Sequence, residues 1–203
     1  PVVGGTERFG TAPARRLAAA GYAVVIGSRD AERAAAAAEE LGAEGATNAA
    51  ACDGADLVVL ATKAEATLAT VDELASAIGA TPVLSVAAEL VFDPAGVFPT
   101  AEPTSIAARI QERVRGPVIA GLHSLAARNL GRGEAPEEDV LVCGDDAEAK
   151  ELVLELAEKI TAGRGVDCGP LASARALEGL TAVIVNVNKR YKAHAGVRVS
   201  GLP

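Results

Sequence analysis

Short runs of apolar, largely β-branched residues alternate along this chain with Ala-rich segments of helical length that carry Glu and Arg. Such alternation is typical of repeated strand-helix-strand units, in which helices cover both faces of a parallel sheet. With 203 residues and 50% hydrophobic content, the chain has enough apolar surface to bury a core without disulfides or metal. We therefore predict an α/β fold: a Rossmann-type doubly wound, mainly parallel sheet, with residues 1–203 in a single domain.

The boundaries of the expected elements follow from the same alternation and from glycine and proline. Pro1–Val3 is interpreted as the end of a first strand, so we expect that some N-terminal residues are missing. The other expected strands are Ala23–Gly27, Asp56–Ala61, Thr81–Val86, Val118–Leu122, Val140–Cys143 and Gly165–Cys168. The expected helices are Thr11–Ala20, Ala31–Leu41, Glu65–Ile78, Thr104–Val114, Ala147–Ile160 and Ala172–Asn186, with a proline-containing loop at residues 94–103.

Charge and cysteine content restrict the class of partner. The net charge of −8 and the absence of a long basic run argue against binding to nucleic acid or to an anionic membrane surface, so small molecules are the expected partners. Three scattered cysteines form neither a disulfide framework nor a metal motif, which favours a cytoplasmic protein without a metal site. The last expected helix is so apolar that we predict a homodimer, in which a second subunit covers it.

The first chemical signal is a glycine-rich turn between the first strand and the first helix. In dinucleotide-binding turns, the first glycine makes a tight turn, the second lets the diphosphate approach the backbone, and the third allows close helix packing. Gly5 and Gly10 fit the first and third roles, whereas Glu7 stands at the second. Glu7 and the diphosphate of a bound dinucleotide are both negatively charged. Two like charges 4 Å apart repel by about 4 kcal/mol at an effective dielectric constant near 20. A turn that binds no ligand therefore remains an alternative. The candidate cofactor-binding residues of this turn are Gly5, Thr6, Glu7, Arg8, Phe9 and Gly10.

The second signal lies at the end of the second expected strand, about 20 residues beyond the glycine-rich turn, where NAD-binding proteins carry an acid for the adenine ribose. This chain has Ser28 and Arg29 there, and Arg33 follows one helical turn later. A hydroxyl and a guanidinium suit a 2′-phosphate, because arginine donates paired hydrogen bonds to phosphate oxygens. NADP is therefore favoured over NAD. The alternative is that both arginines are solvated residues at the start of an amphipathic helix.

Several blocks of the sequence resemble the NADPH-dependent reductases of the deazaflavin coenzyme F420. They are the Gly-Gly-Thr turn at residues 4–6, Gly27–Arg29, Val142–Asp146, Asp167–Leu171 followed by Ala174 and Arg175, and the ending near Gly196–Gly201. The resemblance implies an oxidoreductase with NADP on the first turn and F420 laid over the nicotinamide. Hydride would pass directly between the two rings, so no catalytic acid or base is expected. By the same resemblance, Thr6, Ser28, Arg29 and Arg33 line the NADP site, and His123, Ser124, Leu125 and Ala126 flank the deazaflavin.

Some positions on the expected ligand face depart from the family pattern. Thr62 and Lys63 replace a proline and an aromatic residue near the nicotinamide, although Lys63 could contact a phosphate. Ala126 and Ala87–Ala88 also stand where the family carries prolines. Two alternatives therefore stay open: a catalytically silent or regulatory family member, and an NADPH-dependent reductase of another acceptor. His123 could also be a hydrogen-bonded histidine of a strand-end turn, and Cys143 is not expected to act as a nucleophile.

Overall fold

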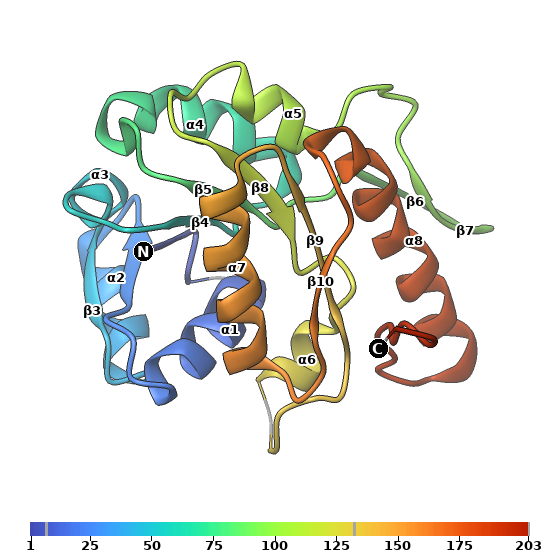
Figure 1. Ribbon diagram of the computed structural model, residues 1–203. Helices are drawn as coiled ribbons and strands as arrows, with labels where there is room; N and C mark the ends of the chain where they lie inside the picture. The colour runs from blue at the N-terminus through green and yellow to red at the C-terminus, as the bar shows by residue number, and fades with distance from the viewer. Residues whose placement is uncertain (7, 132, 203) are drawn as a thin grey trace.

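The structure is a computed structural model that describes residues 1–6, 8–131 and 133–202. The strands of the described chain are β1 (Val2–Val3), β2 (Val25–Ser28), β3 (Glu44–Thr47), β4 (Val58–Leu60), β5 (Val83–Ser85), β6 (Leu90–Asp93), β7 (Gly96–Pro99), β8 (Val118–Gly121), β9 (Val140–Gly144) and β10 (Gly165–Asp167). In these residues, a sheet of eight strands has the order β10-β9-β8-β5-β4-β1-β2-β3 (Figure 1). All neighbours are parallel except β8 and β9. The prediction of a Rossmann-type, mainly parallel sheet is confirmed.

The strand order reverses next to β1, which pairs with β2 on one side and with β4 on the other. Val3 lies in register with Gly27 of β2 and Leu60 of β4. The carboxyl ends of these three strands therefore meet at one edge of the sheet. In open α/β sheets, ligands bind at this edge, at the point where the strand order reverses.

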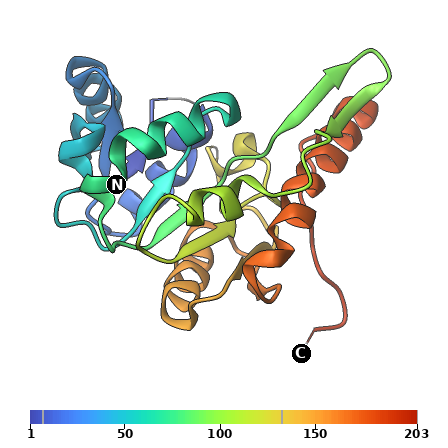
Figure 2. The same cartoon turned by 90° about the horizontal axis from the view of Figure 1, so that it is seen from above.

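Helices cover both faces of the sheet. The helices of the described chain are α1 (Arg8–Ala19), α2 (Ala31–Glu39), α3 (Asn48–Cys52), α4 (Ala64–Ile78), α5 (Ile106–Gln111), α6 (Ala127–Leu130), α7 (Ala147–Ile160) and α8 (Ala174–Tyr191), with a single 3₁₀ turn at Leu171–Ser173. Residues of α1 and α7 share one core cluster, whereas α4, α5 and the beginning of α8 share the cluster on the opposite face (Figures 1 and 2). Strand residues alternate between the two clusters: Val59 joins the first, and Val58 and Leu60 join the second. Burial on both faces explains the continuous apolar runs of these strands.

Four of the expected helices have bounds that differ from the observed ones by two residues or more, and several expected strands are shorter than predicted. The helix expected at Thr11–Ala20 begins three residues earlier, inside the glycine-rich turn. The helix expected at Ala31–Leu41 stops at Glu39. The helix expected at Thr104–Val114 covers Ile106–Gln111, because the Ser105 side chain accepts the N–H of Ala108 and caps it. The last helix continues past Asn186 to Tyr191, where Lys192 adopts a left-handed φ of 52°.

The structure also contains elements that the sequence did not predict. The edge strand β3 and the short α3 lie between the second expected helix and β4. Strands β6 and β7 form an antiparallel hairpin, whose turn and second strand fall in the expected proline-containing loop and whose first strand precedes it. The Asp93 side chain accepts the N–H groups of Ala95 and Gly96 in the turn. The hairpin projects beside α8 (Figure 2). Asn186 of α8 fixes it there by pairing with both backbone groups of Val97, at 2.7 and 2.8 Å.

No helix in the described part of the chain has the length and apolar character needed to cross a membrane.

Candidate functional site

The glycine-rich turn brings the backbone close to the end of β4. Gly4 has a φ of +75°, so the left-handed position of the turn falls on Gly4 and not on Gly5, where the sequence placed the tight turn. A Cβ on Gly5 would lie 2.8 Å from the Val2 carbonyl oxygen, and one on Gly10 would lie 2.7 Å from the Gly5 Cα. The turn therefore needs glycine at all three positions, and Gly10 lets α1 approach β1 closely.

A cavity of about 310 Å³ opens directly beyond this turn. It lies at the carboxyl edge of β1, β2 and β4, where the strand order reverses. Its lining combines predicted cofactor-binding residues from three separate segments with residues that were not predicted. The predicted ones are Thr6, Ser28, Arg29, Arg33, Thr62 and Lys63, and the others are Gly4, Asp30, Asn48, Ala66 and Thr70.

The corner of the cavity beyond β2 carries positive charge. The buried Ser28 hydroxyl accepts the N–H of Asp30 at 3.3 Å. The Asp30 carboxylate caps α2 by accepting the N–H groups of Glu32 and Arg33, at 2.9 and 3.2 Å. This carboxylate is therefore already hydrogen-bonded by the helix. Arg29 and Arg33 are exposed beside it. The arrangement suits an anionic group better than a ribose hydroxyl.

Asn48 is a site residue that the sequence analysis missed. It is the first residue of α3 and is 91% buried, and its Oδ1 has no hydrogen-bond partner in the described part of the chain. That oxygen lies against Gly27, where an added Cβ would approach it to 2.9 Å. A buried polar group without a partner is unfavourable unless a ligand completes its hydrogen bonds. The only signal in the sequence is Thr47, whose hydroxyl caps the unpredicted α3.

A second cavity of about 180 Å³ adjoins the first, and Thr62 lines both. The Thr62 hydroxyl pairs with the Thr67 hydroxyl at 2.9 Å, and Thr67 also donates to the Lys63 carbonyl at 3.0 Å, so the start of α4 holds Thr62 in place. The second cavity is mostly apolar. Its lining comprises Ala61, Thr62, Ala64, Val86, Ala87, Ala88, Leu90, Leu122, His123, Leu125 and Thr181.

His123 is the main polar group of this second cavity. It is buried, and its Nε2 hydrogen-bonds to the Ala87 carbonyl at 3.0 Å, which makes Nε2 the protonated nitrogen. Burial lowers the pKa of His123 to about 4, although the bond to Ala87 opposes that shift. The ring is therefore neutral at pH 7, and its Nδ1 has no partner within the described residues. A neutral imidazole in this state accepts a hydrogen bond through Nδ1.

The backbone immediately before His123 is strained. Leu122 has a φ of +68°, one of two positive values among the described non-glycine residues. This conformation costs roughly 1–2 kcal/mol for an L-residue other than glycine. Such strain persists only where the surrounding structure enforces it, and it concentrates at functional sites.

The other predicted site residues either do not line either cavity or lie outside the residues that the structure describes. Ser124 is fully buried and donates to the Asp139 carbonyl at 2.7 Å, and the Ala126 N–H is bonded to Glu138; neither residue lines the cavity. Glu7 lies outside the described residues, as do the side chains of Arg8 and Phe9. Thr181, which the sequence analysis did not select, lines the second cavity and donates to the His123 carbonyl at 3.5 Å.

Cys143 has none of the properties of a nucleophile. Its side chain is fully buried in the core at the end of β9. Burial, followed by nearby Cys168 and Glu178, raises the pKa of the Cys143 thiol to about 12. The thiolate, which is the reactive form, is therefore essentially absent at neutral pH.

Comparison with known proteins agrees with this geometry. A family model described as NADP oxidoreductase, coenzyme F420-dependent, matches residues 2–89. The F420-dependent NADP reductase of Methanothermobacter marburgensis is 34% identical over 219 residues, which cover 100% of this chain and 98% of that protein. This chain belongs to the F420-dependent NADP reductase family. The reductase of Methanothermobacter thermautotrophicus is 32% identical, covering 100% of this chain and 94% of that protein.

A solved structure extends the family assignment to three dimensions. A crystal structure described as an F420-dependent NADP reductase from an Arthrobacter species superposes with a TM-score of 0.85 at 27% identity, over 98% of both chains. The resemblance inferred from the motifs is thus confirmed by the family model and by these relatives. Because the family is one of oxidoreductases, the chain is an oxidoreductase. A pyrroline-5-carboxylate reductase from Coxiella burnetii, at a TM-score of 0.66 and 13% identity, shares the fold alone.

Proposed function

We propose that this chain transfers a hydride between NADP(H) and coenzyme F420. One observation supports this most directly: a cavity bordered by arginines and a mostly apolar cavity meet at Thr62, at the carboxyl edge of the sheet. Two ligands seated in these cavities would bring their reactive ends together there. When bound, the nicotinamide and the deazaflavin supply the hydride chemistry themselves, and the protein orients them and excludes water.

The first cavity is suited to NADP. Arg29, supported by Ser28 and Arg33, would bind the 2′-phosphate, because guanidinium donors form charge-assisted hydrogen bonds with phosphate oxygens. The Oδ1 atom of Asp30, which lines the same cavity, already accepts the N–H groups of Glu32 and Arg33. Lys63, at the start of α4, adds a further cation for the diphosphate, and Asn48 offers an amide group to the adenosine.

The second cavity is suited to the deazaflavin. Its alanine, valine and leucine side chains offer apolar surface to a flat ring, and their burial shields the reacting atoms from water. Neutral His123 would accept a hydrogen bond from the ring system through Nδ1, and Thr181 lies on the same wall. Direct hydride transfer requires no proton donor at the reacting atoms, so the proposal assigns no catalytic acid or base to either cavity.

We infer that the protein acts as a homodimer in the cytoplasm, on small molecules and not on nucleic acid. The outer surface of α8 exposes Val183, Val187 and Tyr191, and the adjoining hairpin exposes Phe92 and Phe98. An apolar patch of this kind on a soluble protein is typical of an interface, and a two-fold axis would place the same patch opposite itself. The free cysteines support the assignment to the cytoplasm. The net charge of −8 supports small molecules, and not nucleic acid, as the partners.

The experiment that tests the function is a coupled binding and turnover measurement. Purified protein is titrated with NADPH and with NADH, and oxidised F420 is then added while absorbance is followed. We expect tighter binding of NADPH and an NADPH oxidation that depends on F420. Binding of NADPH without F420-dependent turnover would reject the proposal in favour of another acceptor, and failure of both nucleotides to bind at millimolar concentration would indicate a silent family member.

A further inference from the structure

The C-terminal segment His194–Val199 lies against the loop that carries His123. The Val197 N–H donates to the Ser124 carbonyl at 3.2 Å, and the Val197 carbonyl accepts the N–H of Asp139 at 2.8 Å. The C-terminal segment is thus joined through the backbone to Ser124, which lies between His123 and Leu125 of the second cavity, and to Asp139. The C-terminal segment therefore contacts the loop through its backbone.

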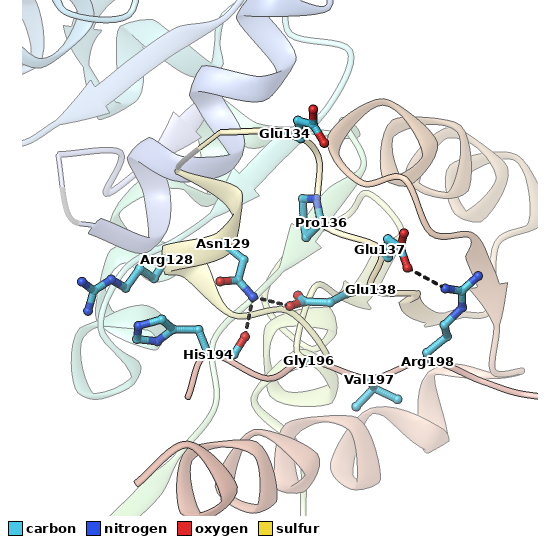
Figure 3. A pocket seen from close by; sticks show the side chains of 10 residues that line it. All are labelled: Arg128, Asn129, Glu134, Pro136, Glu137, Glu138, His194, Gly196, Val197 and Arg198. Carbon is cyan, nitrogen blue, oxygen red and sulfur yellow. Dashed lines mark hydrogen bonds and ion pairs between the residues drawn. The ribbon is translucent and has the colours of Figure 1, made fainter. Parts of the chain in front are cut away.

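Glu138 is the side chain at which these segments meet (Figure 3). One carboxylate oxygen accepts the N–H of Ala126 in the loop at 3.1 Å, and the other accepts the amide of Asn129 in α6 at 2.5 Å. The same Asn129 amide donates to the His194 carbonyl of the C-terminal segment. Glu138 thus connects the loop, α6 and the C-terminal segment without lining either cofactor cavity.

Gly196 permits this arrangement. A Cβ at position 196 would lie 2.2–2.5 Å from the Glu138 side chain, closer than real Cβ contacts allow. The C-terminal segment therefore packs directly on the carboxylate. A side chain at position 196 would displace either the segment or Glu138.

Asp139 secures the other side of the same connection. It is buried, and its carboxylate accepts the N–H of Val199 at 2.8 Å and two donors from Arg164, at 2.9 and 3.1 Å. Burial alone would raise the pKa of Asp139, but these hydrogen bonds outweigh it and lower the pKa to about 2. The Asp139 carbonyl also accepts the Ser124 hydroxyl. The carboxylate is therefore charged and fixed under all ordinary conditions.

We propose that Glu138 is a positioning residue for F420: together with the C-terminal segment, it holds the loop Leu122–Ala126 and thereby the orientation of His123 in the second cavity. The strained Leu122 needs such support, because a non-glycine residue at positive φ relaxes when its surroundings loosen. Since the cavity next to His123 is assigned to the deazaflavin, this inference rests on the proposed function. It predicts an effect on F420 that NADPH binding does not share.

The test compares Glu138→Gln with the wild type and with Glu137→Gln as a matched control. Glutamine keeps the size of the side chain but has only one acceptor oxygen, so it cannot bind both Ala126 and Asn129. Glu137 is adjacent in sequence, but its carboxylate is exposed and pairs only with Arg198 among the described residues. We expect Glu138→Gln to raise KM for F420 by about tenfold or more, since small misplacements at a reacting centre have effects of this size. The Kd of NADPH should stay within about twofold, and Glu137→Gln should leave both constants unchanged.

A measurement without any cofactor makes the inference independent of turnover. The chain has two histidines, His123 and His194, so their imidazole resonances can be followed individually by NMR as the pH is changed. In Glu138→Gln, water should reach the loosened loop, and the pKa of His123 should rise toward the ordinary value of about 6.5. Removal of a nearby negative charge would by itself move that pKa downward, so a rise reports exposure to solvent.

The outcomes separate the two claims. Gly196→Ala, which disturbs the same contact from the C-terminal segment, should reproduce both effects. An unchanged KM for F420 in both variants, or an equal loss of NADPH affinity, would overturn the positioning role. If the wild type shows no F420-dependent turnover, the proposed function fails. The positioning role is then tested by the titration alone, and an unchanged pKa of His123 in the variants would refute the claim that Glu138 holds the loop.

Discussion

Arg29→Ala is the substitution that most sharply tests the assignment of the first cavity. Arg29 is exposed at the mouth of the cavity, next to the buried Ser28 hydroxyl and one helical turn from Arg33. A hydrogen bond between charged groups contributes about 1.5–3 kcal/mol. Because solvent screens an exposed guanidinium, the loss should fall in the lower half of that range, about 2 kcal/mol, which is roughly a 30-fold rise in Kd.

The comparison of NADPH with NADH isolates the 2′-phosphate. NADH lacks this group, so Arg29→Ala should change the Kd of NADH by less than about threefold. Titration by nucleotide fluorescence measures both constants on the same protein. Arg15→Ala is a suitable control, because Arg15 is also exposed but lies on α1 and does not line the cavity. Equal losses for the two nucleotides would refute the phosphate-binding role of Arg29.

Three further predictions concern the second cavity, the missed site residue and the assembly. Between about pH 6.5 and 4, the unfolded state binds a proton on His123 that the folded state does not. The free energy of unfolding should therefore fall by roughly 3 kcal/mol as the pH decreases through this range. Urea denaturation measures this fall, which should be smaller in His123→Asn. Asn48→Asp adds a negative charge to a nucleotide cavity and should weaken NADPH binding by about tenfold in the same titration; an unchanged Kd would exclude Asn48 from the site. Val183→Glu places a charge on the exposed surface of α8 and should yield monomers in size-exclusion chromatography with light scattering, whereas an unaltered mass would move the interface elsewhere.

The core strands could be predicted because their residues are buried on both faces. Val58, Val59 and Leu60 are apolar at every position, so the strand is visible in the sequence without knowledge of its neighbours. Strand β3 has no such signal: Glu44–Thr47 is exposed or half-exposed and contains Gly45. It forms because it pairs with β2 and packs under α2, where a Cβ on Gly45 would lie 2.5 Å from the α2 backbone. This is a tertiary effect that local preference does not encode.

The hairpin is a similar case. Its two prolines, Pro94 in the turn and Pro99 at the end of β7, argued for a loop. Proline is tolerated at strand ends and in turns, and the hairpin is stabilised by Asn186, which lies 89 residues from Val97 in the sequence. A contact across that distance cannot be inferred from a run of four residues.

The candidate site could be predicted where a motif carries it. The residues Thr6, Ser28, Arg29 and Thr62 lie at the ends of strands, or in the turns just beyond them, and the carboxyl ends of these strands share one edge. Locating the strands therefore also locates these residues. Asn48 and Thr181 belong to helices whose place at the edge depends on an unpredicted strand and on the packing of α8. Ser124 and Ala126 lie in the expected segment but face the Glu138–Asp139 connection, because a sequence motif identifies a loop and not the direction of its side chains.

The central claim is that hydride passes directly between two rings that meet at Thr62. The most direct test is a single-turnover reaction of this protein with NADPH carrying two deuterium atoms at C4 of the nicotinamide and with oxidised F420, followed by mass spectrometry of the reduced F420. Direct transfer predicts that one deuterium is retained in the deazaflavin product and that the same reaction with unlabelled NADPH in D₂O places none at the accepting carbon. Loss of the label to water would contradict the account, because the hydrogen would then have travelled through an exchangeable group of the protein.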